Sequence, residues 1–141
     1  MDLREIYTQL IAEESRSQEH RRHLLQPDIV KDGVNPSCGD EIRLEIKLEG
    51  DVLKDLSFTG DGCAISQAST SIMIGLLKGK TLCEARHLAA LFIGMIKREV
   101  TDETELEELE EAIALQNVSN MPARVKCAVL AWHTLNDAIS V

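Results

Sequence analysis

Hydrophobic residues recur at helical spacing at the start of the chain and then alternate with polar residues. Apolar side chains three and four positions apart over residues 3–11 predict an opening amphipathic helix. Segments 42–48 and 52–58 alternate apolar and polar positions, and the turn signal "EGD" between them predicts a β-hairpin. A strand over 29–34 would extend the hairpin to a three-stranded antiparallel sheet. The polar segment 13–27 is expected to leave the first helix and become a loop before the sheet.

From Ala64 onward the apolar positions keep a helical period. A first stripe runs from this residue to the sequence "KGK", which ends it. Thr81 and Glu84 have the spacing of a capping box, which would begin a helix over "TLCEARHLAALFIGMIKREV". Asp102 and Glu105 repeat this spacing and would begin a very acidic helix over "DETELEELEEAIALQ". A proline near the start of "NMPARVKCAVLAW" favours a last helix there.

The order of these elements bounds the fold class and the number of domains. Strands first and helices afterwards predict an α+β domain. The 141 residues contain no internal repeat and no long linker, so residues 1–141 are expected to form one domain. The core is expected to be aliphatic, because aromatic residues make up only 3% of the chain.

Charge and cysteine usage then narrow the possible partners. A net charge of −9 argues against nucleic acid and against anionic membranes, which both require a basic surface. The N-terminus has no apolar run of signal-peptide length, and no segment approaches the roughly 18 apolar residues that span a bilayer. A cytoplasmic protein is expected, and its thiols would stay reduced. The cysteines are then better explained as metal ligands, nucleophiles or core fillers than as disulfides: Cys38, Cys63, Cys83 and Cys127.

The hexapeptide "NPSCGD" brings a thiol and a carboxylate together. Proline and glycine mark a turn, and side chains two positions apart on an extended segment point the same way. Cys38 and Asp40 could therefore reach one metal ion. The alternative is a buried turn cysteine beside a turn-capping aspartate, and the hexapeptide alone does not decide between them.

The other cysteines differ in their surroundings. Cys63 directly precedes a predicted helix, whose N-terminus would stabilise a thiolate, although a small apolar residue closing the helix is the alternative. Cys127 lies roughly 130° from the centre of the apolar stripe of the last helix. Arg124 and Lys126 beside it would favour a thiolate, and a second buried face is the alternative. Cys83 has no turn glycine or carboxylate partner and is interpreted as a spare thiol.

Three thiols and one carboxylate would supply four ligands, the coordination number of tetrahedral zinc. The candidate ligands are spread over most of the chain, and no C-x-x-C pair occurs. The spacing by itself therefore does not identify a metal site.

The stretches "NPSCGDEIRLEIKLEGD", "FTGDGCAISQASTSIM" and "LQNVSNMPARVKCAVLAWHTL" carry three cysteine motifs in order. Together they resemble the SufU branch of the IscU-like iron–sulfur cluster assembly proteins, the family of the NifU N-terminal domain. The likeness runs from about residue 28 to the C-terminus and is weaker over 13–27. It implies an α+β fold with a three-stranded antiparallel sheet and helices packed on one face. It also implies a metal site with four ligands: Cys38, Asp40, Cys63 and Cys127.

Two features favour the SufU branch over the IscU scaffold branch. In IscU-type proteins a histidine usually precedes the last cysteine, whereas this chain has Lys126 there. SufU-type chains also carry an extra segment before that motif, and the acidic stretch around 97–115 is similar to it.

The resemblance implies a zinc-dependent sulfurtransferase that takes persulfide sulfur from a PLP-dependent cysteine desulfurase of the SufS type and supplies downstream iron–sulfur assembly proteins. Cys38 would be both ligand and sulfur acceptor, freed when a histidine of the desulfurase replaces it on zinc. Arg124 is a candidate to stabilise the sulfur anions. The main alternative is a scaffold on which the same residues assemble a [2Fe–2S] cluster for apo-proteins. A third is a purely structural zinc module.

Overall fold

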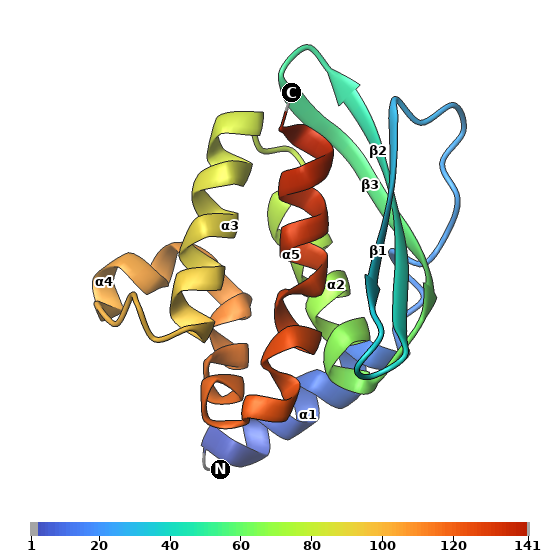
Figure 1. Ribbon diagram of the computed structural model, residues 1–141. Helices are drawn as coiled ribbons and strands as arrows, with labels where there is room; N and C mark the ends of the chain where they lie inside the picture. The colour runs from blue at the N-terminus through green and yellow to red at the C-terminus, as the bar shows by residue number, and fades with distance from the viewer. Residues whose placement is uncertain (1–2, 141) are drawn as a thin grey trace.

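The computed structural model describes residues 3–140 of the chain (Figure 1). The first helix, α1, covers Leu3–Arg16 and confirms the opening helix that the sequence predicted. The side chains of residues 3–7 lie outside the described part, so its apolar face can be followed at Leu10 and Ile11, which pack into the core. No helix in the described part is long and apolar enough to cross a membrane.

The predicted antiparallel sheet is confirmed. Its strands β1 (Ile29–Asn35), β2 (Asp40–Glu49) and β3 (Val52–Asp61) lie in the order β1-β2-β3. The two outer strands pair with β2 on either side, and in this register Leu44 faces Lys31 on one neighbour and Phe58 on the other. Alternate residues of β2 are buried on one face, as the alternating sequence requires.

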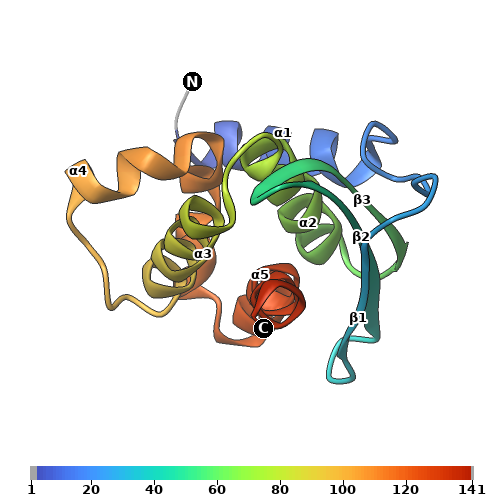
Figure 2. The same ribbon diagram turned by 90° about the horizontal axis from the view of Figure 1, so that it is seen from above.

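Helices cover that one face of the sheet (Figure 2). They are α2 (Ala64–Leu77), α3 (Leu82–Ile96) and α5 (Val125–Ile139). α2 packs against β3, and α5 packs against β1 and β2, so both lie directly on the sheet. α3 packs on the far side of α5, where the Phe92 and Trp132 rings stack with centroids 4.0 Å apart. The fold class is therefore the α+β arrangement that the sequence indicated.

The capping box before α3 is present as predicted. The Thr81 hydroxyl accepts a hydrogen bond from the Glu84 backbone N–H at 3.1 Å, and the Glu84 carboxylate accepts one from the Thr81 N–H at 3.1 Å. Two helix N–H donors that would otherwise be unpaired are satisfied, which fixes where the helix begins.

The predicted acidic α-helix is wrong beyond its first turn. Asp102 caps α4 (Glu103–Leu106) as expected, by accepting from the Thr104 and Glu105 N–H groups. The chain then continues as 3₁₀-helix, η1 (Glu107–Asn120), with a kink at Glu110, and η2 (Pro122–Arg124) leads into α5. In a 3₁₀-helix residues three apart lie on one face. The buried residues here follow that spacing: Leu106, Leu109, Ala112, Leu115 and Val118.

Candidate metal centre

Three chain segments meet at one end of the sheet and bring the predicted site residues together. Cys38 lies in the turn between β1 and β2, and Asp40 is the first residue of β2. Cys63 is the N-cap of α2, and Cys127 is in the first turn of α5. In Figure 1 this turn and the starts of both helices lie at the same end of the molecule.

Cys38, Asp40 and Cys127 form a compact group. One potential ligand atom from each lies within 4.8 Å of the other two, and the Sγ atoms of Cys38 and Cys127 are 3.1 Å apart. Gly39 between the first two has a φ of +69°, in the left-handed region that glycine adopts without steric cost. Asp40 and Cys127 are fully buried, whereas Cys38 is partly exposed. The group therefore has two buried members and one that solvent or a partner can reach.

The Asp40 carboxylate is held from two sides. Its Oδ2 accepts a hydrogen bond from Asn35 Nδ2 at 3.2 Å, and its Oδ1 accepts one from the Cys63 backbone N–H at 2.9 Å. The same Asn35 nitrogen lies 3.7 Å from Cys127 Sγ. Asn35 thus touches two of the candidate ligands, a role that was not predicted from the sequence. Its signal was its place in "NPSCGD", where asparagine before proline is typical of a turn.

Cys63 borders this group without joining it. Its Sγ accepts a hydrogen bond from the Ser66 N–H at 3.4 Å, so the sulfur caps α2 at the position predicted from the sequence. Cys63 is not among the atoms that lie mutually within 4.8 Å. It adjoins the group all the same, because its backbone N–H donates to Asp40 Oδ1 at 2.9 Å.

The expectation that Cys127 lies off the core of its helix is wrong. α5 has a second buried face, made by Cys127, Ala131, Thr134 and Ala138. This face lies against the sheet, where a Cβ added to Gly33 of β1 would come within 2.0 Å of Thr134 Oγ1. The helix is therefore buried on two sides, and Cys127 faces inward toward Asp40.

The charges on the cysteines depend on two opposing effects. Burial, followed by hydrogen bonds with Cys38, Cys63 and Asp40, raises the pKa of Cys127 far above its ordinary value. The pKa of Arg124 is also raised, first by a hydrogen bond with Cys127 and then by the negative charges of the cysteines. Arg124 favours a Cys127 thiolate, but the guanidinium is exposed and burial of the thiol dominates.

The fourth cysteine lies elsewhere. Cys83 is exposed in the first turn of α3, as expected of a spare thiol. Among the described side chains, those of residues 8–140, no other trio of histidine, cysteine or acidic groups lies as close as the group at the sheet end.

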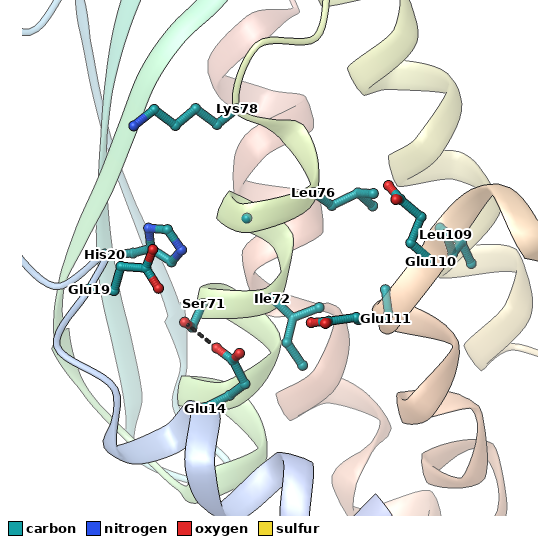
Figure 3. A pocket seen from close by; sticks show the side chains of 12 residues that line it. Glu14, Glu19, His20, Ser71, Ile72, Leu76, Lys78, Leu109, Glu110 and Glu111 are labelled. Carbon is teal, nitrogen blue, oxygen red and sulfur yellow. Dashed lines mark hydrogen bonds between the residues drawn. The ribbon is translucent and has the colours of Figure 1, made fainter.

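A separate hollow of about 450 Å³ lies between α1, α2 and η1 (Figure 3). Ser71 Oγ donates a hydrogen bond to a Glu14 carboxylate oxygen there at 2.7 Å. No cysteine lines the hollow, so it is distinct from the metal centre. Its acidic lining comes from α1, the loop that follows it and η1: Glu14, Glu19, Glu110 and Glu111.

The fold and the cysteine site together define the class of protein. Residues 6–141 match the NifU-like N-terminal domain, and the chain belongs to this family, which includes the IscU and SufU proteins of iron–sulfur cluster assembly. The resemblance that the sequence motifs indicated is therefore confirmed.

Individual relatives carry two kinds of name. The chain is 40% identical over 136 residues to the zinc-dependent sulfurtransferase SufU of Bacillus subtilis strain 168, covering 96% of this chain and 90% of that one. It is 38% identical over 134 residues to the iron–sulfur cluster assembly scaffold protein IscU of Thermotoga maritima, covering 95% and 92%.

Solved structures agree with the fold. The crystal structure of FiSufU from Fervidobacterium islandicum AW-1 superposes with a TM-score of 0.89. Its sequence is 38% identical, and the match covers 96% of this chain and 98% of that one. A NifU-like N-terminal protein from Brucella abortus, with a TM-score of 0.81 and 24% identity, shares the fold.

Proposed function

We propose that the chain is a zinc-dependent sulfurtransferase that accepts persulfide sulfur from a PLP-dependent cysteine desulfurase of the SufS type. The observation that carries this proposal is the unequal exposure of the clustered side chains. Asp40 and Cys127 are buried, and Cys38, 3.1 Å from Cys127, is partly exposed in a turn. A buried pair suits metal ligands, and an accessible sulfur suits an acceptor. The 40% identity to a zinc-dependent sulfurtransferase supports the same assignment.

The residues at the site fit a divalent cation. Asp40 is fully buried and forms no ion pair with a described lysine or arginine, and a buried carboxylate without a countercharge is costly. Burial also raises the pKa of the Cys127 thiol, and a nearby cation would act in the opposite direction. Three sulfurs and one oxygen match the four ligands of tetrahedral zinc. Cys63 would complete the set from the N-terminus of α2, where the helix dipole favours a thiolate.

Cys38 is the residue that performs the transfer. Bound zinc supplies the positive charge that keeps the cysteine sulfurs deprotonated near neutral pH. The Cys38 thiolate attacks the outer sulfur of the desulfurase persulfide and forms a new sulfur–sulfur bond. The persulfide bond of the desulfurase breaks, and its cysteine leaves as a thiolate. Cys38 then carries a persulfide, and no net oxidation or reduction has occurred.

Asp40 and Arg124 assist in different ways. A carboxylate is a harder and more exchangeable ligand than a thiolate, so Asp40 keeps the site labile enough for Cys38 to leave it. The exposed Arg124 guanidinium lies beside the cysteines and would stabilise the negative charge of a persulfide there. Downstream iron–sulfur assembly proteins would receive the sulfur, and the reaction would take place in the cytoplasm.

The proposal is tested by locating the transferred sulfur. The zinc-loaded protein is incubated with the desulfurase and cysteine, alkylated, and digested for mass spectrometry. The extra sulfur should reside on Cys38 and be absent from Cys38→Ser. Cys83→Ser removes an exposed thiol from another part of the molecule and should accept sulfur like the parent protein. Sulfur spread over all exposed thiols would contradict the proposal.

A scaffold function is the second candidate, because the similarly close Thermotoga relative is named a scaffold. Three thiolates also suit iron–sulfur ligation. In this case iron and sulfide, added to the protein without oxygen, would remain bound through a second purification and then pass to an apo-acceptor. Such transfer, without sulfur on Cys38, would favour the scaffold.

A further inference from the structure

The loop after α1 holds an arginine that reaches the metal centre indirectly. Arg21 lies along the outer edge of β3, where it forms a parallel bridge with Phe58. The Phe58 N–H donates to the His20 carbonyl at 2.9 Å, which fixes the loop to this edge. The Arg21 guanidinium lies 4.8 Å from the centre of the Phe58 ring, close enough for a cation–π contact.

The Arg21 guanidinium grips both sides of the segment that carries Cys63. Nη1 donates to the Gly60 carbonyl at 2.7 Å, and Nη2 donates to the Gln67 side-chain oxygen. Gly60 is three residues before Cys63, and Gln67 is four residues after it. A planar guanidinium can serve two acceptors in fixed directions, so this one side chain sets the spacing between the end of β3 and the start of α2.

Gln67 depends on this contact. The residue is 5% exposed, and its Nε2 is buried without a hydrogen-bond partner among the described residues. Its backbone N–H donates to the Cys63 carbonyl at 3.0 Å, so Gln67 belongs to the helical turn that begins at Cys63. Loss of the Arg21 bond would leave a buried amide with both ends unpaired, and the side chain would have to move.

On the other side, Gly60 is fixed against β2. Its φ is +124°, and an added Cβ would lie 2.1 Å from the carbonyl oxygen of Glu41, the residue after Asp40. The segment between Gly60 and Gln67 is thus anchored to the strand that bears one ligand, while the Cys63 N–H donates to that same Asp40. Arg21 adds to these contacts from the outer edge of β3, where it binds both ends of this segment.

We infer that Arg21 is a positioning residue of the metal centre. By hydrogen bonding to both Gly60 and Gln67, Arg21 holds Cys63 in place next to Asp40 and Cys127. The inference rests on the proposed metal site. It assigns a function to segment 13–27, where the sequence resemblance was weakest. Arg21 touches no ligand atom and acts through the two residues that it joins.

The test compares two neighbouring arginines of the same loop in the full-length protein. Arg21→Met removes the clamp, and Arg22→Met is the matched control, because Arg22 binds Asp55 at 2.7 Å and does not touch the Cys63 segment. Cobalt is titrated into each protein to record sulfur-to-metal charge transfer, and zinc affinity is measured against a chromophoric chelator. Iodoacetamide labelling of the zinc-loaded proteins is followed at each cysteine by mass spectrometry.

Arg21→Met should weaken zinc binding about tenfold, which is within the range for removing residues that orient metal ligands. It should also lower the charge-transfer absorbance and speed alkylation selectively at Cys63. Arg22→Met should bind metal and react with iodoacetamide like the parent protein. Gln67→Met removes one of the two Arg21 hydrogen bonds and should change zinc affinity and Cys63 labelling in the same direction, by no more than Arg21→Met does. The double variant should be no worse than Arg21→Met, because that variant has already lost the shared bond.

Three results separate the possible failures. If the parent protein gives no charge transfer with cobalt, the metal site is wrong and the inference falls with it. If the parent does, but Arg21→Met and Gln67→Met match it, the site stands and the positioning role is overturned. If Arg21→Met does not fold, Arg21→Lys is measured in its place. A lysine ammonium cannot reach both acceptors as the planar guanidinium does, so the Cys63 labelling rate should be intermediate.

Discussion

At the scale of single residues, Gly62 is where one added carbon would disturb the metal centre most. A Cβ at this position would lie 2.6 Å from Asp40 Oδ1, which also accepts the Cys63 N–H. Gly62→Ala should therefore displace the carboxylate and weaken zinc binding about tenfold. Competition with a chromophoric chelator measures the change.

Gly75→Ala is the control for that substitution. Gly75 lies within α2, and its added Cβ would meet its nearest neighbour, His20 Nε2, at 3.6 Å, an ordinary contact. Alanine should stabilise the helix by roughly 0.5–1 kcal/mol and leave zinc affinity unchanged. Equal zinc affinity in the Gly62 and Gly75 variants would contradict the account of Asp40.

Asp55 makes a second residue-scale prediction, which concerns pH. Burial pushes the pKa of its carboxyl up, but the hydrogen bond and charge of Arg22, at 2.7 Å, and of Lys78, at 3.4 Å, outweigh burial and hold it below 3.8. A depressed pKa stabilises the fold above the unfolded pKa, and this contribution is lost as pH falls through the folded value. Asp55→Asn should lower the unfolding free energy at pH 7 by roughly 0.5–1 kcal/mol.

That deficit should shrink as the pH falls below about 4 and disappear once the native carboxyl is protonated. Urea unfolding of both proteins at pH 7, 5, 4 and 3 (values chosen around the ordinary aspartate pKa of about 3.9) checks it. A deficit that is independent of pH would show that Asp55 acts through packing rather than charge.

The sequence located the candidate ligands better than it described their surroundings. Cys38, Asp40 and Cys127 lie together, and Cys63 lies at the helix start where the sequence placed it. The second buried face at Cys127 was only the alternative prediction, because a single apolar stripe does not reveal that α5 is covered on two sides. For Asn35 the local pattern indicated a turn and nothing more, because its hydrogen bonds to Asp40 and Cys127 depend on how β1, β2 and α5 pack together.

At the scale of elements, local signals fixed where helices and strands begin more reliably than which type of helix forms. The Thr81 capping box and the alternation of the hairpin are present in the structure. The segment after Leu106 is rich in glutamate and leucine, which favour α-helix. Its buried residues repeat every third position, however, which is the spacing of a 3₁₀-helix on either side of the kink at Glu110.

If η1 packs through every third residue, substitutions at neighbouring positions should differ in their effect on the unfolding free energy. Leu115 is completely buried, so Leu115→Ala should lower the unfolding free energy by about 2–5 kcal/mol. Gln116 is exposed, and Gln116→Ala should change it by no more than about 0.5 kcal/mol. Chemical denaturation of both variants checks this. A similar loss in both would mean that η1 does not pack through every third residue.

At the scale of the whole molecule, the apolar core does not depend on the metal centre. Buried apolar side chains from the sheet and from the helices packed on it and around it form this core, among them Phe58, Phe92 and Trp132. The candidate ligands lie at one end of the sheet. A protein built in this way should remain folded when its metal is removed, unlike a structural zinc module.

Removal of zinc with a chelator should therefore preserve the far-UV circular dichroism and a cooperative thermal transition. The midpoint should fall, because a metal that binds the native state stabilises it by mass action. Circular dichroism before and after chelation, and after zinc is restored, measures both effects. Loss of the cooperative transition on chelation would favour the structural module over the sulfurtransferase.

The most direct test of the central claim is the rate at which a SufS-type desulfurase turns over cysteine in the presence of the zinc-loaded protein. If Cys38 accepts the persulfide sulfur, the parent protein should stimulate turnover strongly and Cys38→Ser should not, although both fold. No stimulation by the parent protein would contradict the transfer function and move the cluster scaffold to first place.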